Sequence, residues 1–100
     1  MLEEPPKFPG GHEAMFDYLA KNLRYPPQAR EEAAQGVVYL SFVILEDGSI
    51  GDVKVLRGVH RLLDEEAVHV VSAMPSWVPG KQRGKPVRVQ FTMPVKFALK

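Results

Sequence analysis

The C-terminal stretch "GKPVRVQFTMPVKFALK" constrains the fold of this chain more than any other feature. Every odd position from Val87 to Leu99 is apolar, and the even positions are mostly polar, interrupted by Pro94 and Ala98. Strict alternation is the period of a strand with one buried face. Its thirteen residues would span roughly 44 Å at about 3.4 Å per residue, against a usual strand of about 5–6 residues. We therefore predict an unusually long final strand.

Pro94 indicates that this strand lies at an edge of the sheet. Proline has no N–H to donate, so it is tolerated at an edge or a bulge but not inside a sheet. The stretch "VVYLSFVIL" (37–45) is apolar on both faces, which suits a central strand. We expect 37–45 at the centre and 50–58 and 87–99 on its flanks. The last strand would extend past its neighbour and leave one side of its backbone free.

Helical and turn patterns complete the order of elements. Apolar spacings of three and four predict helices from His12 to Leu23 and within "HRLLDEEAVHVVSAM", and "YPPQAREEAAQG" predicts a short helix between the first of these and the sheet. Asp47-Gly48 predicts a hairpin turn, and "PSWVPGKQRGKP" an irregular loop. The fold class is therefore α+β, with helices packed on a small three-stranded antiparallel sheet. A Pro/Gly-rich arm, residues 1–11, would precede a single domain at 12–100.

The residue inventory argues against an enzyme or a metal protein. Cysteine is absent and the formal net charge is only +1, which excludes thiolate chemistry and a strong general attraction to nucleic acid. The three histidines are scattered without metal-ligand spacing, and His69 is expected to be solvated. The acids at 64–66 suit a helix N-terminus, where the helix dipole favours them. We predict no catalytic residues, no metal and no cofactor.

The loop around Trp77 allows two interpretations. Trp77 with Lys81, Arg83 and Lys85 could bind single-stranded nucleic acid or an acidic glycan through stacking and charge. Alternatively, Trp77 fills the core and the cations keep a glycine-rich loop soluble. The second interpretation is favoured, because a lone tryptophan in a small domain is usually buried.

Several phrases in order resemble the C-terminal domain of TonB-type energy transducers. They are "YPPQA", "GVVYLSFVILEDGSIGDVKVLRG", "LLDEEAVHVVSAMPSWVPGKQRGKPV" and "MPVKF". The preceding "FPGGHEAMFDYLAKNLRYP" resembles the long N-terminal variety of that domain. The resemblance implies a soluble periplasmic domain of an inner-membrane-anchored protein. Such a domain binds the box peptide of outer-membrane transporters and passes on force from inner-membrane proton-channel partners for nutrient uptake.

The resemblance also implies where the box peptide would bind. In the family the peptide adds as a strand along the last β-strand (β-augmentation), beside the Tyr-Pro segment. The segment residues carried over are Asn22, Arg24, Tyr25 and Pro26, with asparagine standing where the best-known members have glutamine. The strand residues carried over are Arg88, Val89, Gln90, Phe91, Thr92, Met93 and Val95.

Other functions stay open at this point. A domain of the same fold could serve as a sensor or adaptor in a membrane signalling or peptidase protein, or as a glycan-binding module through the loop around Trp77. The free edge could also pair with a second copy of the chain to form a homodimer.

Overall fold

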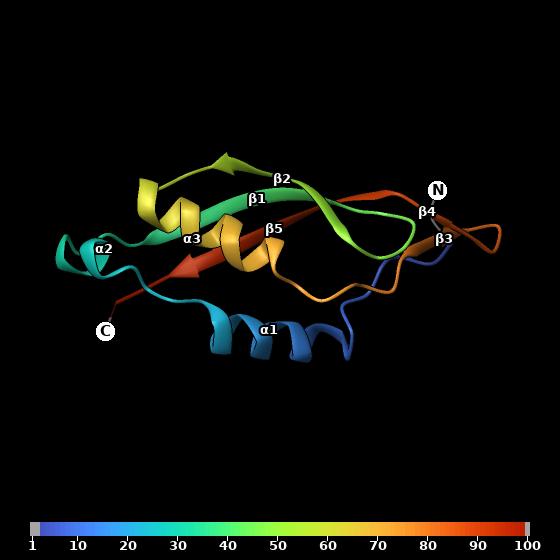
Figure 1. Cartoon of the computed structure of the whole chain (residues 1–100), viewed down its shortest axis with the longest axis horizontal. Coiled ribbons are helices and arrows are strands. Elements are labelled where there is room, and N and C mark those ends of the chain that lie inside the picture. Colours follow the sequence, from blue (N-terminus) through green and yellow to red (C-terminus); the bar gives the residue numbers. More distant parts are fainter. Residues whose placement is uncertain (1–2, 100) are drawn as a thin grey trace.

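A computed structural model describes residues 3–99; Met1, Leu2 and Lys100, at the outer ends of the predicted arm and domain, lie outside the described residues. Three antiparallel strands form the main sheet, in the order β2-β1-β5 (Figure 1). Their bounds are Gly36–Ile44 for β1, Ile50–Arg57 for β2 and Val89–Phe97 for β5. The helices are α1 (Gly11–Asn22), α2 (Pro27–Glu31) and α3 (Arg61–Ser72). The predicted α+β class, the central position of 37–45 and the edge position of the last strand are confirmed.

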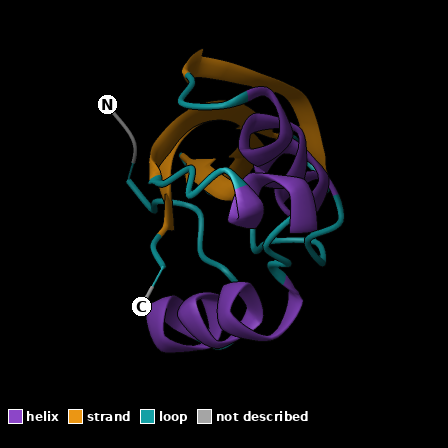
Figure 2. Cartoon of the chain, turned by 90° about the vertical axis from the view of Figure 1, so that its left-hand side faces the viewer, coloured by secondary structure: helices purple, strands orange, loops and turns teal. Residues whose placement is uncertain are grey.

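The core forms where one face of the sheet meets α3. Alternate residues of β1 are completely buried: Val38, Leu40, Phe42 and Ile44. The apolar side chains of α3 meet them and are buried too, namely Leu63, Ala67, Val70 and Val71, together with Met74 just after the helix. Figure 2 shows the strands curving around this helix layer. Burial of these apolar side chains is the main stabilising contribution, on the order of 1.5–3 kcal/mol for each large one.

The prediction of one thirteen-residue final strand is wrong. The strand breaks at Arg88, because 85–87 form a separate strand, β4 (Lys85–Val87), that pairs with β3 (Gly80–Gln82). The remaining strand, β5, pairs with β1 over its full length, from Gly36 opposite Phe97 to Ile44 opposite Val89. It therefore does not extend past its neighbour. The long alternation therefore covers two strands, β4 and β5, which belong to different sheets but continue the same apolar–polar alternation.

The segment from Pro75 to Pro86 is more regular than predicted. Its hairpin, β3–β4, turns at Arg83 and Gly84, whose φ angles are 53° and 75°. Two central residues with positive φ make the tight turn whose twist matches paired strands. The short second helix also differs from the prediction: α2 ends at Glu31, and Ala33 has a left-handed φ of 55° that ends the helical path before Gly36.

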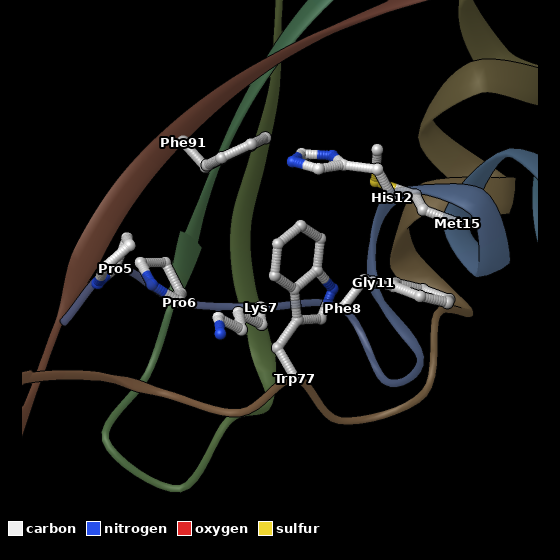
Figure 3. A pocket seen from close by; sticks show the side chains of 9 residues that line it. All are labelled: Pro5, Pro6, Lys7, Phe8, Gly11, His12, Met15, Trp77 and Phe91. Atoms are coloured by element: carbon white, nitrogen blue, oxygen red, sulfur yellow. The ribbon is translucent and has the colours of Figure 1, made fainter.

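The N-terminal arm is bonded to the start of this hairpin. Lys7 and Val78 exchange backbone hydrogen bonds of 2.9 and 2.8 Å, and Glu4 and Lys81 exchange bonds of 3.1 and 2.9 Å. The arm thereby places Phe8 in the core, where its ring lies edge-on to Trp77 at 5.7 Å between centroids (Figure 3). Trp77 is only 4% exposed, so the interpretation of this residue as a core side chain is confirmed.

The turn between β1 and β2 requires its glycine. Gly48 has a φ of 88°, and a Cβ atom there would lie 2.0 Å from the carbonyl oxygen of Trp77. The Gly48 carbonyl also accepts a 2.8 Å hydrogen bond from the Trp77 N–H. Hydrogen bonds from the hydroxyl and the N–H of Ser49 hold the pKa of Asp47 below its usual range. The predicted Asp47-Gly48 hairpin is confirmed.

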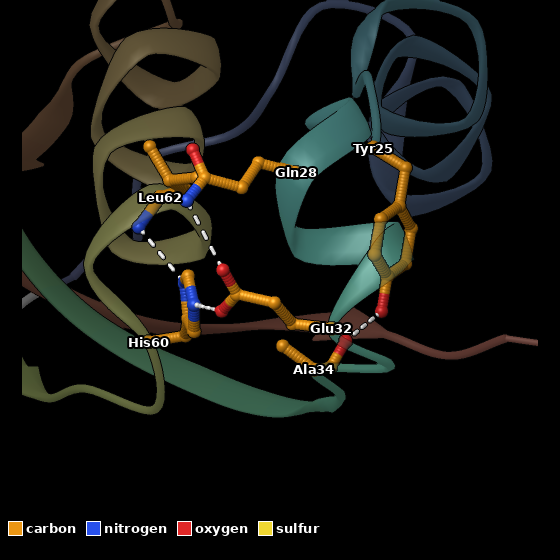
Figure 4. Close-up of polar contacts among 6 residues, drawn as sticks. All are labelled: Tyr25, Gln28, Glu32, Ala34, His60 and Leu62. Atoms are coloured by element: carbon orange, nitrogen blue, oxygen red, sulfur yellow. Dashed lines mark hydrogen bonds and ion pairs between the residues drawn. The ribbon is translucent and has the colours of Figure 1, made fainter.

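A polar network joins α2 to the start of α3 (Figure 4). His60 caps α3, since its Nδ1 accepts a 3.1 Å hydrogen bond from the Leu62 N–H. Its Nε2 therefore carries the proton and donates to Glu32 Oε1 at 2.8 Å. Gln28 Nε2 donates to the other carboxylate oxygen at 3.1 Å. The hydrogen bond from His60, and then that from Gln28, lower the pKa of Glu32 from its ordinary value.

We expect Phe8→Ala to destabilise the fold by roughly 3–5 kcal/mol, because it removes a buried aromatic ring and leaves a cavity. Phe16→Ala is the matched control: Phe16 is 63% exposed, and its loss should change stability by about 0.5 kcal/mol or less. Urea denaturation followed by circular dichroism measures both. Equal effects of the two changes would show that the arm is not part of the folded core.

We expect Glu32→Gln to reduce stability at neutral pH but not in acid. A carboxyl group whose pKa is lowered by folding stabilises the fold above its unfolded value, 4.5, and that contribution is lost as the pH falls through the lower folded pKa. The difference in urea midpoint between the unchanged chain and the variant should therefore shrink from pH 7 to about pH 3. Glu31→Gln, at the last residue of α2 and next to Glu32, controls for loss of a carboxylate. A difference independent of pH would contradict the stabilising role of the ionised Glu32 carboxylate.

Candidate functional site: the outer edge of the last strand

The outer edge of β5 is free. One side of this strand pairs with β1, and no backbone hydrogen bond from any other segment within residues 3–99 reaches its other side. An edge of this kind presents a row of N–H and C=O groups to which a further strand can bind. The free flank that the sequence predicted is therefore present in the described part of the chain.

Pro94 determines which residues turn their backbone groups outward. It lies opposite Tyr39 without interrupting the register, which requires its nitrogen to point away from β1, because that nitrogen cannot donate. In an antiparallel ladder the residues alternate between bonding inward and facing away. The outward-facing residues are thus the even ones: Gln90, Thr92, Pro94 and Lys96. All four offer a carbonyl, and all except Pro94 offer an N–H.

The odd residues of β5 serve the sheet and the core instead. Their backbone groups bond to β1, and the side chains of Met93, Val95 and Phe97 are each 2% exposed. Phe91 is half-buried, with its ring centroid 5.2 Å from that of Trp77. Among the strand residues carried over from the family, only Gln90 and Thr92 therefore present backbone groups to a visiting strand. Separating the outward-facing residues from the inward-bonding ones required the register of the β1–β5 ladder, which places Pro94 opposite Tyr39 without a shift.

Arg88 lies in the bend between β4 and β5 rather than in either strand. Its Nε donates to Glu46 Oε1 at 3.3 Å, and both side chains are largely exposed. An exposed ion pair of this kind contributes at most about 1 kcal/mol. Arg88 is therefore positioned at the start of the edge but is free to exchange its partner.

The Tyr-Pro segment packs at the opposite end of β5. The ring of Tyr25 lies edge-on to Phe97 at 5.6 Å between centroids, and its hydroxyl donates to the carbonyl of Ala34. The Arg30 guanidinium lies 5.2 Å from the centroid of the same ring, within range of a cation–π interaction. Pro26 is the N-cap residue of α2. The structure thus brings Tyr25 to the end of the free edge.

Asn22 and Arg24 bond to helices rather than to β5. Asn22 Nδ2 donates to the carbonyl of Tyr18 at 2.8 Å, and the Arg24 N–H donates to Glu66 Oε2 at 2.9 Å. Glu66 thereby fastens the Tyr-Pro segment to α3. No local pattern indicated this role for Glu66, because the acids at 64–66 are explained equally well by the helix dipole and the contact spans 42 residues.

A cavity of about 350 Å³ lies beside the first half of β5 (Figure 3). Its lining residues come from the arm, the first turns of α1, Trp77 and β5: Pro5, Pro6, Lys7, Phe8, Gly11, His12, Met15, Trp77 and Phe91. Sequence reasoning did not find this cavity. The "KFPGG" stretch that supplies part of its wall was noted only as a family feature and as a Pro/Gly-rich arm.

The described residues contain no candidate metal site and no membrane-spanning helix. Within residues 3–99, no group of three histidine, aspartate or glutamate side chains is placed to hold a metal ion. No helix in that range is long and apolar enough to cross a bilayer. What the edge offers is a row of main-chain donors and acceptors beside an apolar cavity.

Comparison with known proteins assigns the family. The family model for the C-terminal domain of the Gram-negative bacterial TonB protein matches residues 21–99. The solution structure of the Helicobacter pylori TonB C-terminal domain (its residues 179–285) is 26% identical, with a TM-score of 0.66 over 86% of this chain and 78% of that one. The Pseudomonas aeruginosa TonB C-terminal domain is 31% identical, with a TM-score of 0.64 over 77% of this chain and 78% of that one. A search of curated proteins returned no match.

The family match covers the central sheet, α2, α3 and the free edge of β5 in one continuous span. This chain therefore belongs to the TonB C-terminal domain family.

Proposed function

We propose that this domain acts in the periplasm as part of a TonB-type energy transducer. It binds the box peptide of an outer-membrane transporter by strand addition to β5. It then passes on force that inner-membrane proton-channel partners draw from the proton gradient, for nutrient uptake. The observation that carries the proposal is the free outer edge of β5 in a member of the TonB family.

The energetics of such an edge suit a contact that must hold and also release. Each main-chain hydrogen bond contributes only about 0.5–1.5 kcal/mol net. The bonds of a ladder lie perpendicular to the strands, so a pull along the strand loads several of them together. Affinity then comes mainly from the peptide's backbone, and its side chains supply the choice between transporters.

The anchoring of the Tyr-Pro segment supports a role for this segment in peptide binding. Tyr25 contacts Phe97 at the end of β5, and Glu66 fixes Arg24 to α3. The exposed side chains of Asn22 and Arg24 are thereby held near the end of the edge. We propose that they contact the peptide beyond the ladder itself.

The glycan or nucleic-acid alternative is not supported by the packing. Stacking on a base or a sugar needs an accessible ring face, whereas Trp77 is 4% exposed and is surrounded by Phe8, Phe42 and Phe91. The cations of the β3–β4 hairpin alone offer charge without stacking.

We expect Thr92→Pro to weaken binding of a transporter box peptide by roughly three- to tenfold, the value of one main-chain hydrogen bond. Proline already occupies an outward-facing position at 94, so the same residue at 92 should leave the β1–β5 ladder intact. Isothermal titration calorimetry measures the affinity, and circular dichroism checks the fold.

We expect Pro94→Ala to tighten binding by a similar factor, because it adds an outward N–H to the edge. Val95→Pro is the contrasting control: its nitrogen faces β1, so this change should unfold the sheet rather than weaken binding selectively. Peptide affinities that are the same for the unchanged chain, Thr92→Pro and Pro94→Ala would refute strand addition at this edge.

A further inference from the structure

The cavity beside Phe91 adjoins the free edge of β5. We propose that it receives one large apolar side chain of the added strand, and that this contact gives the domain a preference among peptides. The inference rests on the proposed strand addition and goes beyond it, because it assigns a side-chain pocket to residues of the N-terminal arm and α1.

The geometry of strand addition directs a side chain toward this cavity. Neighbouring residues on adjacent strands carry their side chains on the same face of a sheet. The visiting residue beside Phe91 therefore shares the face on which Phe91 lines the cavity. The outward-facing groups of Gln90 and Thr92 flank this position, so main-chain bonds on both sides would fix the visiting residue there.

The walls select an apolar occupant. Most of the lining consists of apolar side chains, among them Phe8, Met15, Trp77 and Phe91, whereas Lys7 and His12 are exposed side chains. A cavity of roughly 150 Å³ with apolar walls is large enough to hold benzene. About 350 Å³ therefore leaves room for a leucine or phenylalanine side chain. Among the lining residues, the buried polar atom without a hydrogen-bond partner is Trp77 Nε1, and its single neutral N–H would not offset the hydration that a carboxylate loses.

The arm makes the cavity a formed site rather than a gap. Pro5 and Pro6 of its wall lie between two pairs of backbone hydrogen bonds, those of Glu4 with Lys81 and those of Lys7 with Val78. Phe8 is also packed against Trp77 and Tyr18. A preformed pocket spares the bound state the cost of ordering its walls. Figure 3 shows His12 and Phe91 pointing toward the space above the Trp77 ring.

A substituted peptide series tests the pocket. The probe is a fluorescein-labelled transporter box peptide in which each position in turn carries alanine, leucine, phenylalanine or aspartate, with affinity measured by fluorescence anisotropy. At one position only, leucine and phenylalanine should bind about tenfold or more tightly than alanine, as expected for burial of a large apolar side chain. Aspartate at that position should bind more weakly than alanine.

His12→Trp should fill the cavity from the helix side and abolish this preference, while the alanine peptide binds as tightly as it does to the unchanged chain. Glu13→Trp adds the same bulk to the next residue of α1, which does not line the cavity, and should keep the preference. In the unchanged protein, NMR should show cross-relaxation between the preferred side chain and the ring protons of Trp77, a readout that does not depend on either variant folding.

The outcomes separate this inference from the proposed function. Peptides that bind along β5 with no preferred position, or with no contact to Trp77, would overturn the pocket and leave strand addition standing. Failure of every peptide to bind would overturn both. A preference that survives His12→Trp in a folded protein would also overturn the assignment.

Discussion

The ladder between β1 and β5 is the interaction on which the rest of the structure depends. It runs through nine residue pairs without a shift, whereas the β1–β2 ladder contains irregularities. This continuity places Val38 opposite Val95, Leu40 opposite Met93 and Phe42 opposite Phe91, so that one face of both strands is apolar. It also assigns every backbone group of β5 to one side or the other. The core and the free edge are therefore two consequences of one register.

The two ends of β5 are supported by different parts of the chain. At Phe97 the support is Tyr25, which is tied through Ala34 and Arg30 to the segment around α2. At Phe91 it is Trp77, against which the arm packs the ring of Phe8. Both supports lie outside the main sheet and leave the outer backbone groups uncovered. Under the proposed function, in which β5 carries a load along its axis, the strand would be supported near both ends while its edge stays accessible.

Local patterns in the sequence predicted the parts of this arrangement that have local causes. The alternation through Val95 and Phe97 predicted the buried face of β5, and Pro94 predicted that the strand lies at an edge. The break at Arg88 was missed because the alternation continues unchanged from β4 into β5. The hairpin at Arg83 and Gly84 was missed because a glycine-rich loop does not by itself reveal the positive φ of its arginine. The bond from Arg24 to Glu66 and the cavity joining the arm to Phe91 depend on residues far apart in the chain, for which a single sequence carries no signal.

Amide hydrogen exchange along β5 tests the central claim most directly. In the monomeric protein the amides of Phe91, Met93 and Val95 should exchange slowly, since they bond to β1, while those of Gln90, Thr92 and Lys96 should exchange quickly. Addition of a transporter box peptide should slow the second group and leave the first unchanged. Slow exchange of Gln90 and Thr92 in the free monomer, or fast exchange of both in the peptide complex, would contradict a free edge that accepts a strand.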